Sequence, residues 1–148
     1  MDERILEQLK LLNRYVQYLE HIAKADQEKL TSDFVLRGGA ERYLQLAIES
    51  CINIGNRILS LLQDKSPVRS PETYSDIFHE MARLGVIPGD FLDTVLNMVR
   101  FRNRIVHMYW DIDPAQLHEI LRFHLGDFTS FRDYVIAFVN AGKLPERS

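Results

Sequence analysis

The feature of this sequence that most constrains its fold is a helical repeat of apolar residues. In residues 2–29, apolar side chains recur at steps of three and four, which places them on one face of an α-helix. Only seven glycines and five prolines interrupt the 148 residues, and this scarcity favours long helices over a sheet with many tight turns. The pattern therefore predicts an all-α fold. The repeat in this first segment consists of Ile5, Leu9, Leu12, Val16, Leu19 and Ile22.

Helix start and stop signals divide the rest of the chain. Thr31, Ser32 and Asp33 offer N-cap chemistry for a second helix, Ser70-Pro71 begins a third, and Asp113 caps the last. About five helices with short connections predict an antiparallel helical bundle that forms one domain over residues 1–148. The expected helices cover residues 2–29, 40–62, 70–84, a segment from about 91, and 113–140 with a bend at Gly126.

Cysteine content and charge limit the function classes. A single cysteine, Cys51, excludes an internal disulfide and a cysteine-based zinc site. The charged opening MDERILEQLK does not resemble a signal peptide, and no apolar run approaches membrane-spanning length, so we expect a cytoplasmic protein without membrane association. A net charge of -3 argues mildly against broad, nonspecific nucleic-acid binding, although it leaves room for a localised basic cleft.

A polar stripe runs along the expected helix 40–62, opposite its apolar face. It consists of Gln45, Glu49, Asn53 and Arg57 at four-residue spacing. The simpler interpretation is a solvated helix face. The alternative is that Glu49 and Asn53 line a groove shared with another helix.

A cluster of polar residues in the segment after residue 91 is the most informative part of the chain. On a helical wheel of about 100° per residue, Arg102 falls in the middle of an apolar stripe. A guanidinium directed at a core is costly unless it is paired or lines a cleft that water or a ligand enters. The stripe consists of Phe91, Val95, Met98, Val99, Ile105 and Val106.

The position of His107 relative to Arg102 is less clear. The two lie about 140° apart on the same wheel, so they would not converge on a regular helix, whereas Asn103 and His107 share a face. Either the helix ends near Val106, which places His107 and Tyr109 on the following turn, or a second copy of the chain completes the site. Spacing alone leaves both arrangements open.

These residue types suit cleavage of RNA without a metal. A histidine can take a proton from a ribose 2′-hydroxyl or return one to a leaving oxygen. An arginine offers a planar fork for phosphate oxygens and for charge that grows in the transition state. Asn103 can orient the histidine or a phosphate, Tyr109 can stack on a base, and Arg100 and Arg104 add positive charge beside them. Such residues on a helix are more often structural than catalytic, so this pattern is only a pointer.

The stretch from Arg102 to Tyr109 resembles the signature of the HEPN superfamily, and specifically of the HepT toxins of HEPN–MNT toxin–antitoxin pairs. That signature is arginine, four residues, histidine, any residue, tyrosine, with a polar residue such as Asn103 after the arginine. Residues 41–49 look like the family's second helix, and residues 74–78, 85–88 and 109–113 look like its later landmarks. The resemblance covers nearly the whole chain, with no departure at the motif positions.

The resemblance implies a HEPN-like bundle that forms a homodimer or a larger even-numbered assembly, with both motifs facing one cleft. It implies a metal-independent endoribonuclease toxin in which Arg102 and His107 are catalytic and Asn103, Arg104 and Tyr109 support them. It also implies an antitoxin partner, an MNT-type nucleotidyltransferase that transfers AMP to Tyr109. We expect no metal and no cofactor.

Two other functions are compatible with the sequence. The first is a catalytically silent helical interaction module, or a substrate protein for a partner nucleotidyltransferase; the intact set of Arg102, Asn103, His107 and Tyr109 favours the enzyme instead. The second is a nucleotide-binding accessory domain, for which no nucleotide motif is present. We predict that Cys51 is an inert core residue and that His21 lies on the surface.

Overall fold

The chain folds into a bundle of helices. The computed structural model describes residues 1–65, 67–107 and 112–145, and in these residues it contains seven α-helices and one short 3₁₀-helix, so the all-α prediction is confirmed. The elements are α1 (Glu3–Ile22), α2 (Gln27–Ser32), α3 (Phe34–Leu62), α4 (Tyr74–Arg83), η1 (Gly89–Phe91), α5 (Leu92–His107), α6 (Pro114–Phe123) and α7 (Leu125–Asn140).

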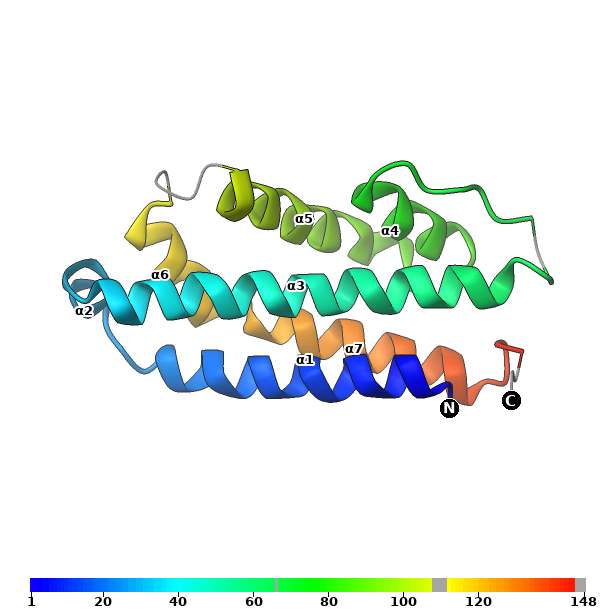
Figure 1. Cartoon of the computed structure of the whole chain (residues 1–148), viewed down its shortest axis with the longest axis horizontal. Coiled ribbons are helices and arrows are strands. Elements are labelled where there is room, and N and C mark those ends of the chain that lie inside the picture. Colours follow the sequence, from blue (N-terminus) through cyan, green and yellow to red (C-terminus); the bar gives the residue numbers. More distant parts are fainter. Residues whose placement is uncertain (66, 108–111, 146–148) are drawn as a thin grey trace.

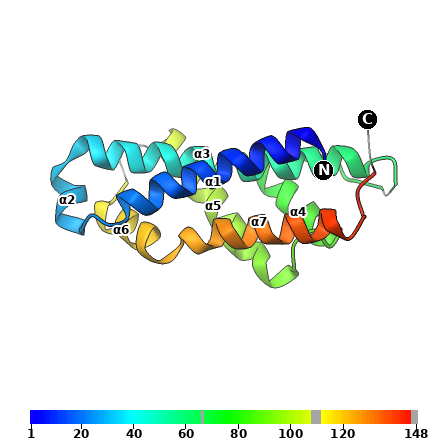
Figure 2. The ribbon, with the colours of Figure 1, turned by 90° about the horizontal axis from the view of Figure 1, so that it is seen from below.

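The long helix α3 is the axis of the bundle. It runs the length of the molecule, with α1 and α7 on one side and α4 and α5 on the other (Figure 1). Figure 2, seen from below, shows α1 and α7 alongside each other. Both α1 and α5 run opposite to α3, as expected for an antiparallel bundle (Figure 1).

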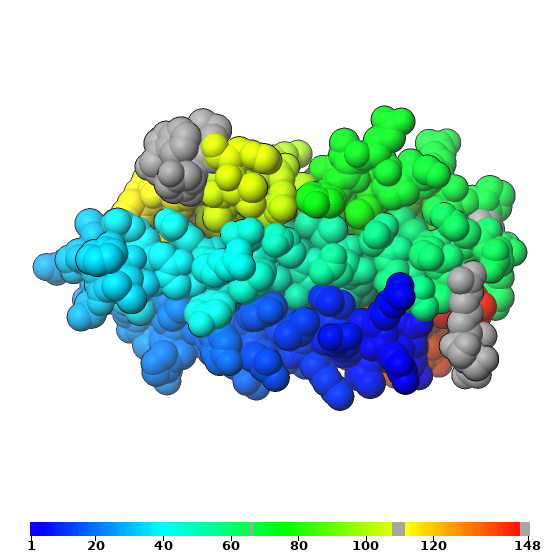
Figure 3. All heavy atoms as spheres, in the orientation of Figure 1, coloured from blue at the N-terminus to red at the C-terminus, as the bar shows by residue number. Residues whose placement is uncertain are grey.

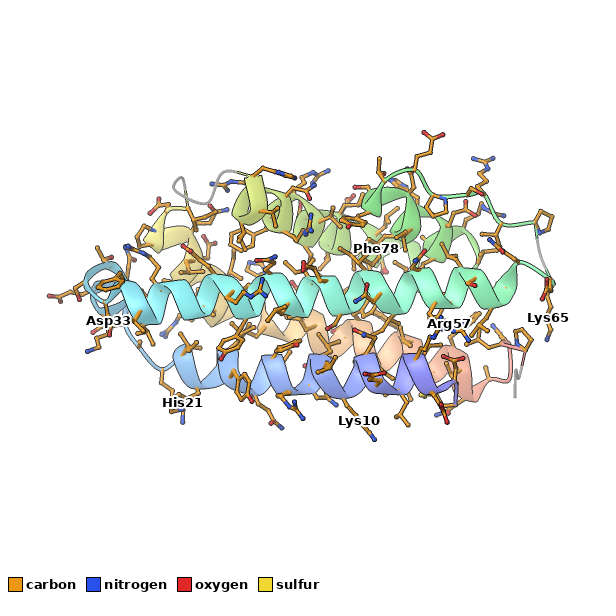
Figure 4. All side chains as sticks on the ribbon, viewed as in Figure 1. Lys10, His21, Asp33, Arg57, Lys65 and Phe78 are labelled. Atoms are coloured by element: carbon orange, nitrogen blue, oxygen red, sulfur yellow. The ribbon has the colours of Figure 1, made fainter. Side chains whose placement is uncertain are left out.

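The apolar stripe predicted for the first helix is buried. All six of its members are less than one-tenth exposed and join one continuous core. On the opposite side of α1, Lys10 and His21 point away from the bundle, so the surface position predicted for His21 is confirmed (Figure 4). Cys51 is fully buried, and this burial raises the pKa of its thiol. None of the helices in the described residues is long and apolar enough to cross a membrane.

The helix count differs from the expected five because two predicted helices are each divided in two. The segment predicted as one helix over residues 2–29 ends at Ile22, and α2 begins after Asp26, whose carboxylate accepts a hydrogen bond from the Lys29 N–H at 2.8 Å. Apolar periodicity does not register such a local cap. The segment predicted over 113–140 divides at His124, and Gly126, the expected bend, lies in the first turn of α7.

Two helix starts also differ from the prediction. Helix α3 begins at Phe34, because the Asp33 carboxylate accepts hydrogen bonds from the Val35 and Leu36 N–H groups, and it continues through Gly38 without interruption. Helix α4 begins after Thr73 rather than at Ser70. There the Thr73 hydroxyl accepts from the Asp76 N–H, and the Asp76 carboxylate accepts from the Thr73 N–H, which forms a capping box.

Candidate active site

A groove opens where the start of α4 and the second half of α5 lie over α3. Its volume is about 830 Å³, and Arg102, Asn103 and His107 of α5 line it together with Glu49 and Asn53 of α3. The first residues of α4, including Tyr74, form the remaining wall. In the space-filling view, α5 and α4 are neighbours above α3 (Figure 3). Three helices thus bring polar side chains from distant parts of the sequence to one hollow.

Arg102 is the most restricted of these side chains. Its side chain is only 15% exposed, and one of its guanidinium nitrogens lies 3.6 Å from the Glu49 carboxylate. The guanidinium carbon lies 5.0 Å from the centre of the Tyr74 ring, and the Nη1 group donates to Asn103 Oδ1 at 3.3 Å. The buried Nε has no hydrogen-bond partner among the described residues. The arginine in the apolar stripe is therefore both paired and at the edge of a groove.

His107 reaches the same groove from the end of α5. It is the last residue of the helix and is exposed, as is Asn103. Asn103 lies between Arg102 and His107 around the helix axis, because successive residues are about 100° apart. The three side chains therefore follow one another along the groove, so a single chain supplies both the cation and the imidazole.

The polar stripe of α3 has two different environments. Arg57 pairs at 2.8 Å with Asp2, the N-cap residue of α1, which lowers the pKa of that carboxyl, and Figure 4 shows Arg57 facing the start of α1. Asn53 donates to Gln8 of α1 at 3.4 Å and also borders the groove, as Glu49 does. The stripe is thus a contact surface toward α1 as well as one wall of the groove, rather than a uniformly solvated face.

Arg104 lies on the other side of α5. It donates a hydrogen bond to Gln116 of α6 at 2.8 Å and borders a second cavity, of about 490 Å³, together with Arg100. Both arginines are two residues from Arg102, and two helical steps of about 100° carry a side chain to the opposite face. The structure therefore does not bring Arg104 into the groove with Arg102 and His107.

Tyr74 is a groove residue that sequence reasoning did not select. It is 42% exposed and its ring packs against Arg102. The sequence predicted that this helix begins at Ser70, so it did not place Tyr74 in the first turn of α4. A helical wheel drawn for one helix also cannot show which residues of another helix face it. Tyr109, the predicted acceptor of AMP, lies outside the described residues. In the described part of the chain, no three His, Cys, Asp or Glu side chains are grouped so that they could hold a metal ion.

The arrangement combines a cation with a group that can carry a proton. A guanidinium beside an open groove can donate hydrogen bonds to two phosphate oxygens through its planar fork. An exposed imidazole on the same groove can take a proton from a hydroxyl or return one. These are the requirements for moving charge and protons during cleavage of a phosphodiester.

Comparison with known proteins finds two similar nucleases and a similar solved toxin structure. A nuclease of Aphanizomenon flos-aquae, "tRNA nuclease HepT", is 29% identical over 122 residues, 81% of this chain and 79% of the relative. The "mRNA nuclease HepT" of Shewanella oneidensis is 26% identical over 93% of this chain and 99% of the relative. The solved structure of a tri-AMPylated Shewanella oneidensis HEPN toxin in complex with an MNT antitoxin superposes with a TM-score of 0.83, at 26% identity and with coverage of 93% and 99% of the two chains.

The resemblance noted from the sequence is confirmed at the level of the family. The family model described as "Ribonuclease HepT-like" matches residues 5–135, which is most of the chain. The solved structure of YutE from Bacillus subtilis, with 17% identity and a TM-score of 0.70, shares the fold alone. This chain belongs to the HepT-like ribonuclease family.

Proposed function

We propose that this protein is an endoribonuclease toxin that cleaves RNA in the groove between α3, α4 and α5. The observation that carries the proposal is the placement of Arg102, Asn103 and His107 along one groove, with the arginine held by Glu49 and Tyr74. The names of the relatives, which are nucleases of tRNA and mRNA, support RNA as the substrate.

In the proposed reaction, a ribose 2′-oxygen attacks the adjacent phosphorus and the bond to the 5′-oxygen breaks. His107 takes the proton of the 2′-hydroxyl or supplies a proton to the leaving 5′-oxygen, and Arg102 binds the phosphate oxygens as their charge grows. Asn103 orients the phosphate or the imidazole. The products are a 2′,3′-cyclic phosphate and a 5′-hydroxyl, and a second histidine from another copy of the chain would complete the acid–base pair in a dimer.

We further propose regulation by an MNT-type nucleotidyltransferase antitoxin that transfers AMP to Tyr109. The complex of a tri-AMPylated relative with its MNT antitoxin supports this partner. Tyr109 is two residues beyond His107, and an attached phosphate would bring negative charge beside Arg102. Charge-assisted pairing with the arginine would then occupy the position of the RNA backbone.

Cleavage of single-stranded RNA by the purified, unmodified protein in EDTA tests the proposed reaction. We expect 2′,3′-cyclic phosphate ends, and we expect His107→Ala to lose most of the activity while its melting temperature stays close to that of the wild type, because the side chain is exposed. His21→Ala is the matched control, since His21 is also an exposed histidine but lies on α1 and does not line the groove. Activity that appears only with added divalent metal would sink this mechanism. Loss of fold in His107→Ala would show that the histidine is structural.

A further inference from the structure

The contacts of Arg102 raise the question of what fixes its guanidinium. The nearest carboxylate, Glu49, lies 3.6 Å away, which is longer than the roughly 2.7–2.9 Å of a charge-assisted hydrogen bond. The contact to Asn103 comes from the next residue of the same helix and is also long, at 3.3 Å. Neither contact by itself fixes the orientation of the guanidinium, and a third neighbour lies beside it.

That neighbour is the ring of Tyr74. The guanidinium carbon lies over the ring at 5.0 Å from its centre, within the range of about 6 Å for a cation–π contact. A cation–π contact with the ring needs no hydrogen-bond acceptor, whereas a bidentate ion pair with Glu49 would use two N–H groups of the guanidinium. The ring contact therefore restrains the guanidinium and leaves N–H donors available for phosphate oxygens.

Tyr74 lies on a firmly held part of the fold. It is the first residue of α4, directly after Thr73, and the capping box with Asp76 fixes the helix start. Backbone hydrogen bonds to Asp76 also lower the pKa of that carboxyl, so the cap stays charged at neutral pH. Since Tyr74 is 42% exposed, its ring borders the groove and is not a core residue.

We propose that Tyr74 is a positioning residue for RNA cleavage, whose ring holds the Arg102 guanidinium in the plane that presents its free N–H groups to the scissile phosphate. This inference rests on the ribonuclease proposed above. Because Arg102 acts on charge that grows in the transition state, loss of the ring affects kcat more than KM.

Two substitutions at Tyr74 separate the effect of the aromatic ring on activity from the effects of the hydroxyl and of apolar bulk. Tyr74→Phe keeps the ring, and we expect its kcat to stay within about threefold of the wild type. Tyr74→Leu keeps an apolar side chain without a π face, and we expect kcat to fall about tenfold with little change in KM. Tyr18→Leu is the matched control, since Tyr18 is also 42% exposed but lies on α1, away from the groove. If Tyr74→Leu lowers the melting temperature strongly, Tyr74→Met replaces it under the same criterion.

Coupling to Arg102 distinguishes positioning from a general structural effect. In an Arg102→Lys background, which lacks the planar guanidinium, Tyr74→Leu should cause little further loss of kcat. In NMR spectra, the Arg102 Nε–H signal is identified as the one that disappears in Arg102→Lys. This hydrogen should exchange slowly with solvent in the wild type and in Tyr74→Phe, and faster in Tyr74→Leu. This readout needs no activity, so it tests the contact even if the chain does not cleave RNA.

Three results would overturn the inference. The first is a Tyr74→Leu kcat within threefold of the wild type, and the second is a loss confined to KM. The third is an equal loss from Tyr74→Leu in the wild-type and Arg102→Lys backgrounds. A wild-type protein that cleaves no RNA would instead refute the proposed function.

Discussion

The close approach of α4 to α3 depends on the absence of a side chain at Gly55. Replacement of Gly55 by alanine should therefore lower the stability of the protein. A Cβ added at Gly55 would lie 2.7 Å from Ile77 Cγ2 and 2.8 Å from Met81 Sδ. Ordinary carbon–carbon contacts are about 3.5–4.0 Å, so Gly55→Ala requires a displacement approaching 1 Å. The Met81 side chain can rotate, but Ile77 Cγ2 is attached directly to a helical Cβ and moves only with α4.

Two opposing terms set the magnitude. Overpacking a buried contact costs about 1–3 kcal/mol, whereas alanine is favoured over glycine inside a helix by about 1 kcal/mol. We therefore expect Gly55→Ala to lower the free energy of unfolding by about 1 kcal/mol, with a melting temperature about 2–4 °C lower. Gly38→Ala is the control, because it lies in the same helix and has no atom within 4 Å of the added Cβ. It should gain stability.

Urea unfolding monitored by circular dichroism measures both variants against the wild type. The expected result is a lower midpoint for Gly55→Ala and a higher one for Gly38→Ala, with unchanged slopes. A Gly55→Ala protein as stable as Gly38→Ala would show that α4 adjusts freely. The close packing of α3 and α4 would then not determine the position of the groove wall.

Three further predictions concern single side chains. The pKa of Glu80 is lowered to about 2, first by the hydrogen bond from Arg83 and also by that from the Arg69 N–H. The stability that the charged Glu80 contributes is therefore complete above its ordinary pKa of 4.5 and is lost as pH falls toward 2. Over this pH range, the urea midpoint of Glu80→Gln should decrease less than that of the wild type. The Cys51 thiol, buried and with a raised pKa, should react with a thiol reagent only when the protein unfolds, and rapid labelling of the folded protein would contradict its core position. After co-expression with the nucleotidyltransferase, intact mass should increase by whole AMP units in the wild type but not in Tyr109→Phe, and modification that persists in this variant would rule out Tyr109 as the acceptor.

The sequence predicts best those helix faces and helix ends that depend only on residues within one short segment. The apolar face of α1 and the Asp113 cap of α6 were correct, because both depend on neighbours within a few residues. Gly85, which directly follows the helix predicted over residues 70–84, has φ of 79°, a conformation that favours glycine. The error at Asp26 arose because apolar periodicity does not register a local cap. The error at Thr73 arose because Ser70 also offered a cap, and local pattern does not decide which of the two is used.

The candidate site shows the same division between local and tertiary information. Arg102 stood out in the sequence because a charge in an apolar stripe requires a partner or a cleft, and the structure supplies both. The sequence could not identify Glu49 as that partner, since the two residues are on different helices and their approach depends on how α3 packs against α5. Arg104 shows the converse, because it is close to the motif in sequence while the helix turns its side chain toward a different cavity; its supporting role stays a prediction.

The groove wall formed by α4 is the part of the candidate site that the sequence predicts least. Its position depends on Gly55, which admits α4 to close contact with α3, and on the cap that begins the helix at Tyr74 rather than three residues earlier. This cap places Tyr74 in the first turn of α4, where its ring lies beside the Arg102 guanidinium. The absence of a side chain at Gly55 and the choice of Thr73 as cap therefore together determine which residue faces the guanidinium. Neither residue belongs to the motif, yet the arginine of the motif takes its orientation from the helix that they position.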